Sequence, residues 1–162
     1  MSVRTAVDTR SGKATYGFAG SEDTGLDLNS SGSVTVLHDG DEFLAPFVHK
    51  ITVSGSTATS GVIASWSPTN DYLILGAYVR VTTDSNGACT LDIGPAANAT
   101  TADDTLFDGL SVATTGTFNS ADNQGSNGKL GQTVTASVTV AVASGNATGL
   151  VADVYLVVVP LS

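Results

Sequence analysis

The strongest constraint on the fold is a regular alternation of small apolar and hydroxyl side chains in residues 133–142. The even positions hold Val or Ala, and the odd positions hold Thr or Ser up to a final Ala. Successive side chains of a β-strand point to opposite faces of its sheet, so this period of two predicts a strand with one face in a core. No segment shows the 3.6-residue period of an amphipathic helix. The sequence therefore predicts an all-β protein.

Two further segments, residues 72–83 and 151–160, alternate in the same way but carry apolar side chains on both faces. A face of this kind is too apolar for the free surface of a monomer and indicates contact with another subunit or segment. The residues predicted to form such an oligomer interface are Tyr72, Ile74, Tyr78, Tyr155 and Val157.

Shorter strand-like segments complete the pattern. They lie at residues 34–37, 47–54, 61–66 and 87–93, with weaker ones at 110–113 and 116–118. The Asn86-Gly87 pair and residues 144–149 are expected to close hairpins. About seven or eight strands at a spacing of about 8–12 residues predict an antiparallel β-sandwich. We prefer a jelly-roll topology, because paired hairpins bracket a long crossover. The immunoglobulin alternative lacks its expected Cys…Trp…Cys spacing.

Two regions do not indicate regular structure over most of their length. Residues 1–41 are polar and glycine-dotted and hold three of the 6 Lys and Arg, namely Arg4, Arg10 and Lys13. Residues 95–129 form a long excursion rich in Asp, Asn, Ser and Gly. We expect an extended N-terminal arm (1–41) and a β-sandwich domain (42–162) interrupted by this excursion, which is either functional or poorly ordered.

Charge and cysteine content exclude several classes of protein. A formal net charge of −9 on 162 residues argues against binding to nucleic acid or to anionic membranes. Neither a secretory signal nor an apolar run long enough to span a bilayer is expected from the sequence. The single cysteine, Cys89, cannot form an internal disulfide and is expected to be a small buried hydrophobe.

No motif indicates catalysis or a cofactor. His38 and His49 lack partners at zinc-binding spacing, and no nucleophile elbow, P-loop or dinucleotide fingerprint occurs. Carboxylates of the excursion could wrap a calcium ion, but their spacing matches no calcium-loop pattern, and ordinary loop residues are preferred. We expect a protein that is not an enzyme and that holds no cofactor and no metal.

A resemblance supplies a possible function. Residues 72–83 are followed by Leu-Asp-Ile-Gly at 91–94 and by Asp-Thr-Leu-Phe-Asp-Gly-Leu at 104–110, and the chain closes with an apolar strand at 149–158. This succession resembles small virion proteins of tailed bacteriophages, in which a strand ending in Leu-Asp-Ile/Val-Gly precedes an Asp-Thr-Leu-x-Asp-Gly-Leu segment. The likeness covers residues 72–160, just over half of the chain.

The resemblance implies a capsid decoration (cement) protein on the outer surface of the virion. Its partners would be the major capsid protein and further copies of itself, with a trimer favoured and a pentamer possible. The arm would contact the shell, and its candidate contact residues are Arg4, Arg10, Lys13, Tyr16, Phe18, Val34 and Val36. The alternative is a receptor-binding or carbohydrate-binding head of a fibre, turret or tail.

Overall fold

The chain divides into two compact units, Met1–Pro46 together with Ser162, and Phe47–Leu161. The computed structural model describes the backbone of residues 3–8, 13–18, 25–28, 34–38, 41–54, 59–121 and 131–161, and within these ranges the side chains from residue 45 onward. These ranges contain strands and turns and no helix. The all-β prediction is confirmed for this part of the chain.

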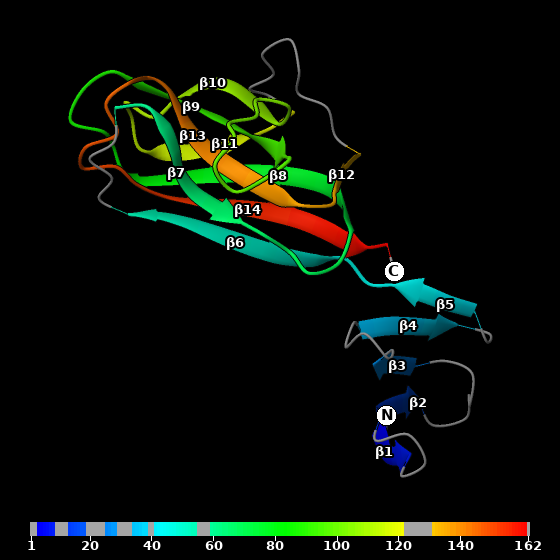
Figure 1. The fold of residues 1–162 in the computed structure, drawn as a ribbon. Coiled ribbons are helices and arrows are strands. Elements are labelled where there is room, and N and C mark those ends of the chain that lie inside the picture. The colour runs from blue at the N-terminus through cyan, green and yellow to red at the C-terminus, as the bar shows by residue number, and fades with distance from the viewer. Residues whose placement is uncertain are drawn as a thin grey trace. The chain divides into compact units, whose positions relative to one another are not determined.

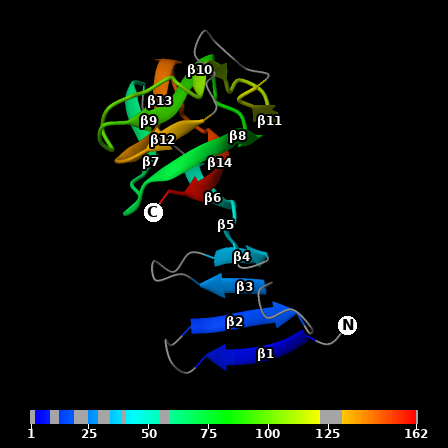
Figure 2. The same cartoon turned by 90° about the vertical axis from the view of Figure 1, so that its right-hand side faces the viewer.

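The first unit is a five-stranded antiparallel sheet in the order β1-β2-β3-β4-β5, so neighbours in sequence are neighbours in space (Figure 2). Its strands are β1 (Val3–Asp8), β2 (Lys13–Phe18), β3 (Gly25–Leu28), β4 (Val34–His38) and β5 (Asp41–Leu44). The sequence predicted an extended arm here with one strand at 34–37. The other strands escape prediction because they are short, polar and separated by Gly-containing and Ser-containing segments.

The second unit contains two antiparallel sheets that form two layers (Figure 1). One sheet has the order β11-β8-β14-β6, with β12 also pairing with β8, and the other has the order β10-β9-β13-β7. The strands are β6 (Phe47–Ser54), β7 (Gly61–Trp66), β8 (Tyr72–Thr83), β9 (Cys89–Ala96), β10 (Phe107–Ser111), β11 (Gly116–Asn119), β12 (Gln132–Val134), β13 (Ser137–Gly145) and β14 (Val151–Pro160).

A single hydrophobic core joins the two sheets. Alternate residues of each central strand supply it, for example Val154 and Leu156 of β14 against Val138 and Val140 of β13. All four are fully buried. Burial of apolar surface is the main stabilisation available to such a fold, and it contributes about 25 cal/mol of free energy per Å² removed from water. Cys89 belongs to this core, as predicted.

The strongest alternating segment is divided between the two sheets. Residues 132–134 form β12 beside β8, and after a bend at residues 135–136 the chain continues as β13 in the opposite sheet. Val134 and Val138 are nevertheless both buried in the one core. Alternation reports only which side chains point inward, so it could not reveal that the strand changes sheet at this point.

Both predicted hairpins are wrong for the same reason. β8 and β9 lie in different sheets, as do β13 and β14, so the connections at Asn86-Gly87 and residues 144–149 cross from one layer to the other. The two crossing loops bond to each other instead. The Asn86 amide donates to the Thr148 carbonyl (2.9 Å), and the Asn146 amide donates to the Ala88 carbonyl (3.4 Å).

A β-bulge decides which side chains of β8 point outward. Val157 pairs with Gly76 and Val158 pairs with Ile74, which leaves Leu75 as an extra residue. An extra residue reverses the alternation on one side of the bulge. Ile74 is therefore fully buried and Leu75 is exposed. The alternation in the sequence predicted the reverse, with Leu75 on the core face and Ile74 on the face of Tyr78 and Arg80. The prediction that Ile74 contributes to an exposed interface is wrong.

Part of the predicted excursion covers the β10-β9-β13-β7 sheet on the side that points away from the core. The Thr139 hydroxyl of β13 donates to the Thr101 carbonyl (2.9 Å), and the Leu106 amide donates to the Ile93 carbonyl (2.9 Å). Thr139 and Leu106 are both fully buried. The excursion also contributes strands β10 and β11, close to the two weak strand segments seen in the sequence. Residues 122–129 of the excursion lie outside the described residues.

A substitution of Gly145 tests how closely the two crossing loops pack. Its φ is +81°, and a Cβ at this position would overlap the Ala88 carbonyl oxygen. We predict that Gly145→Ala lowers the free energy of unfolding by about 1–3 kcal/mol or more, because a non-glycine residue is strained there and the neighbouring backbone must move. Urea denaturation followed by circular dichroism measures the change.

Gly87→Ala is the matched control, since a Cβ there would meet no atom within 4 Å. We expect it to leave stability within about 1 kcal/mol of the unmodified chain. Equal stability of the two variants would contradict this account of the loops.

Candidate interaction face

The outer side of the β11-β8-β14-β6 sheet carries the candidate site. Here the side chains that point away from the core include two tyrosines, two valines and charged groups of both signs. We call this surface the outer face, and it is formed by Val48, Lys50 and Thr52 of β6, Asp153, Tyr155 and Val157 of β14, Tyr78 and Arg80 of β8, and Thr117 of β11.

Strand register arranges these residues in rows. Tyr155 pairs with Tyr78 on one side and with Lys50 on the other. In the adjacent row Val157 lies between Val48 and Gly76. Val48 and Tyr78 are exposed over 60% and 44% of their surfaces, and exposed apolar side chains mark a contact surface when they are contiguous. The two rows form a continuous apolar area across three strands.

The row on the other side of the tyrosines is polar. Asp153 accepts a hydrogen bond from the Thr52 hydroxyl (2.8 Å), lies 3.5 Å from the Lys50 ammonium group and accepts a longer hydrogen bond from the Tyr155 hydroxyl (3.3 Å). The Thr52 hydrogen bond, with help from Lys50, lowers the pKa of the Asp153 carboxyl. The ion pair is solvent-exposed and adds little stability, and the shorter Thr52 hydrogen bond is the contact that keeps Asp153 turned toward β6.

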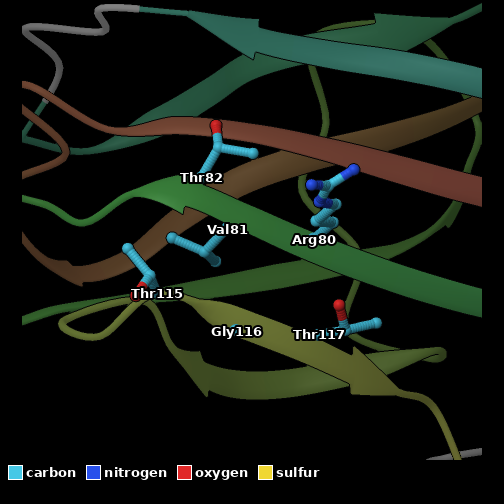
Figure 3. Close-up of a pocket in the computed structure, with 6 residues that line it drawn as sticks. All are labelled: Arg80, Val81, Thr82, Thr115, Gly116 and Thr117. Carbon is cyan, nitrogen blue, oxygen red and sulfur yellow. The ribbon is translucent and has the colours of Figure 1, made fainter.

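Arg80 lies on the other side of Asp153, in the same row. It pairs in register with Asp153 and with Thr117 of β11. Arg80 and Thr117 help to line an open hollow of about 360 Å³ between β8 and the start of β11 (Figure 3). The complete lining is Arg80, Val81, Thr82, Thr115, Gly116 and Thr117. Lys50 and Arg80 are the cations whose side chains the structure describes, and both project from the outer face.

A second cluster, of aromatic rings, closes one edge of the sandwich. His49 stacks on Trp66 with ring centroids 4.1 Å apart and an interplanar angle of 19°. Tyr72 lies 5.2 Å from Trp66 and 5.5 Å from Phe47. His49 and Trp66 come from the edge strands β6 and β7 of the two sheets, so their stack covers the core between them. Burial lowers the pKa of the His49 imidazole.

The acidic residues of the excursion gather near β9 without forming a metal site. Asp92 accepts a hydrogen bond from the Gly109 amide (2.9 Å). Burial raises the pKa of Asp92, and the charges of Asp108, Asp104 and Asp103 raise it further against the effect of that hydrogen bond. Within the described ranges, no three His, Cys, Asp or Glu side chains are placed to hold a metal ion. The calcium alternative gains no support.

The structure brings together part of the predicted interface. Tyr78, Tyr155 and Val157 lie side by side on the outer face, whereas Ile74 is in the core and the half-buried Tyr72 packs at the aromatic edge. Of the predicted arm residues, Arg10 lies outside the described residues. The others lie in β1, β2 and β4, whose side chains are also outside the description: Arg4, Lys13, Tyr16, Phe18, Val34 and Val36.

Sequence reasoning missed the hollow beside Arg80. Alternation already placed Arg80 on the same face as Tyr78. The two threonines at residues 115 and 117, however, come from a segment more than thirty positions further along the chain (115 − 80 = 35). Only the pairing of β11 with β8 brings them next to Arg80, and no local signal in the sequence indicates that pairing.

Comparison with known protein families, with curated protein sequences and with solved structures finds no match. Among the residues that the structure describes, no helix is long and apolar enough to cross a membrane.

The His49–Trp66 stack predicts a pH-dependent fluorescence signal. Trp66 is the only tryptophan, and a protonated imidazole in contact with an indole quenches its emission. Because burial lowers the pKa of His49, we expect quenching with a midpoint below about 6.5, the ordinary value. The stabilisation from the neutral stack is complete above that pH and is lost as pH falls through the lower, folded-state pKa.

Emission is measured between pH 8 and pH 4 on the folded chain, with His49→Gln and His38→Gln as the paired variants. His49→Gln should abolish the transition and His38→Gln should retain it. A midpoint at or above the ordinary histidine pKa would contradict the burial of His49 against Trp66.

Proposed function

We propose that this chain is a structural virion protein, a capsid decoration protein of a tailed bacteriophage that acts without catalysis on the outer surface of the head. In this proposal the Phe47–Leu161 unit makes the homo-oligomer, with a trimer favoured, and the first unit contacts the major capsid protein. The observation that carries the proposal is the outer face, whose residues are of the kind that form protein interfaces.

The strand pairing supports a jelly-roll topology for the second unit. A jelly roll arises when four nested strand pairs of a long antiparallel ribbon wrap into two sheets. The pairs β6–β14, β7–β13, β8–β11 and β9–β10 have this nested arrangement. Jelly rolls occur widely in viral capsid proteins, and also in lectins. The fold alone does not assign a function, so the surface chemistry must support the choice.

The chemistry of the outer face favours contact with protein. Tyrosine and arginine are enriched among the residues that dominate binding energy at interfaces. Here Tyr78 and Tyr155 pair in register, and Arg80 lies two residues after Tyr78 on the same face of β8. Val48 and Val157 add an apolar area beside them. A net charge of −9 keeps such a protein soluble at high copy number and away from nucleic acid.

Binding stabilises a capsid by mass action, because a ligand that binds only the assembled shell shifts the equilibrium toward it. The six strand residues and Arg10 of the first unit remain the candidate capsid contacts in this proposal. They are Arg4, Arg10, Lys13, Tyr16, Phe18, Val34 and Val36.

Light scattering on the purified chain, with and without isolated capsids, tests both parts of the proposal. We expect an oligomer in solution that binds capsids at a regular lattice position. Tyr78→Ser should weaken self-association by about tenfold or more, since interface tyrosines commonly contribute about 2 kcal/mol. Leu161→Ser is the matched control, because Leu161 is similarly exposed (47% against 44%) but lies beyond the end of β14.

A monomer that ignores capsids would refute the proposal. Binding confined to a single vertex or to the tail would instead favour the receptor-binding or carbohydrate-binding alternative. Equal effects of the Tyr78→Ser and Leu161→Ser substitutions would remove the outer face from the oligomer contact.

A further inference from the structure

Arg80 lies opposite an aspartate whose carboxylate is already engaged by other residues. This aspartate, Asp153, accepts hydrogen bonds from Thr52 and Tyr155 and lies 3.5 Å from the Lys50 ammonium group. Arg80 itself makes no ion pair with any residue in the described part of the chain. In a chain of net charge −9, with carboxylates abundant elsewhere, a guanidinium group left free on the sheet surface is available to an external anion.

The hollow beside Arg80 offers further hydrogen-bond donors. Thr115 and Thr117 are exposed, and their hydroxyl groups have no hydrogen-bond partner among the described residues. The Thr82 hydroxyl is already committed, since it donates to the Val151 carbonyl (3.1 Å). Figure 3 shows that Arg80 and Thr117 belong to the adjacent strands β8 and β11. One guanidinium and two free hydroxyl groups therefore line the same open hollow of about 360 Å³.

We propose that this hollow binds the carboxylate of an aspartate or glutamate side chain presented by a partner protein. Arginine binds a carboxylate through two parallel N–H donors, and a remaining lone pair of the carboxylate can accept from the Thr117 hydroxyl, since Thr117 pairs with Arg80 in register. A phosphate would bring close to two negative charges at neutral pH, which a single guanidinium cannot balance beside the acidic remainder of the chain.

The surroundings of the hollow favour a protein as the source of the carboxylate. Tyr78 lies two residues before Arg80 on the same strand and the same face, and Tyr155 lies next to Tyr78. A partner that places an acidic side chain in the hollow would therefore also cover the apolar rows of the outer face. The use of the hollow by a partner protein rests on the proposed assembly function, whereas carboxylate binding itself does not.

Nuclear magnetic resonance of the full-length ¹⁵N-labelled chain tests carboxylate binding. Sodium acetate and N-acetyl-aspartyl amide are the probes, and sodium chloride at equal ionic strength and inorganic phosphate are the comparison arms. We expect saturable shifts of the Gly116 and Thr117 amides and of the Arg80 Nε–H with both carboxylates and not with chloride. Arg80→Gln should weaken binding by about tenfold or more, since charge-assisted bidentate pairs are the strong ones.

Lys50→Gln is the matched control, because it removes the same charge from the same face, lies outside the lining of the hollow, and leaves Asp153 bonded to Thr52 and Tyr155. We expect it to alter carboxylate affinity by less than about twofold, since the charge it removes is exposed and screened. Shifts that chloride reproduces, a preference for phosphate over acetate, or equal losses in both variants would each overturn the site.

Capsid co-sedimentation of the Arg80→Gln and Leu161→Ser variants tests the partner. Arg80→Gln should weaken either self-association or capsid binding, whereas Leu161→Ser, which lies beyond the end of β14 and outside the outer face, should not. Acetate binding without any effect of Arg80→Gln on assembly would keep the carboxylate site and reject its use by a protein partner. A chain that binds neither capsids nor itself, yet still binds acetate, would reject the proposed function alone.

Discussion

The structure of the second unit depends on burying one apolar face of each sheet against the other. The residues that do so are mostly valines with a few leucines and isoleucines, and they come from alternate positions of β8, β9, β13 and β14. Because the side chains are small and β-branched, they are stiff and pack closely between layers of pleated strands. The outward-facing positions that no loop covers can then carry interaction chemistry.

The two sheets use their outward positions differently. On the β10-β9-β13-β7 sheet the loop that contains Thr101 and Leu106 covers β13, so even the hydroxyl side of that strand is buried. Gly94 makes this covering possible, since a Cβ there would overlap the Asp103 carboxylate and approach the Thr105 amide to 2.8 Å. On the β11-β8-β14-β6 sheet no described segment covers Tyr78 or Val48. This difference makes the outer face of that sheet the candidate interaction face.

Charge follows the same division. The excursion gathers carboxylates near Asp92 and their charges help to raise its pKa, while the outer face holds the described cations Lys50 and Arg80. Lys50 is satisfied by Asp153 at 3.5 Å. Arg80 is the group whose charge remains free among the described residues, and it stands beside exposed tyrosines. A partner with a complementary acidic side chain would meet both features in one contact.

The sequence by itself determined the fold class, the inward-facing residues of most strands, and the burial of Cys89. Each of these follows from the period of two and from composition, which are local properties of a strand. It also indicated that Tyr78, Tyr155 and Val157 lie on a face too apolar for a free surface. It failed where one residue changes the parity, as Leu75 does at the bulge in β8.

Tertiary structure alone decided which strands are partners. Asn86-Gly87 has the composition of a tight hairpin turn, yet β8 and β9 separate into different sheets, because each must place its apolar side chains in the core from opposite sides. The same long-range pairing brings β11 beside β8 and creates the hollow at Arg80. Alternation in a strand specifies which side chains face inward, and only the packing of the whole chain specifies which strand lies next to it.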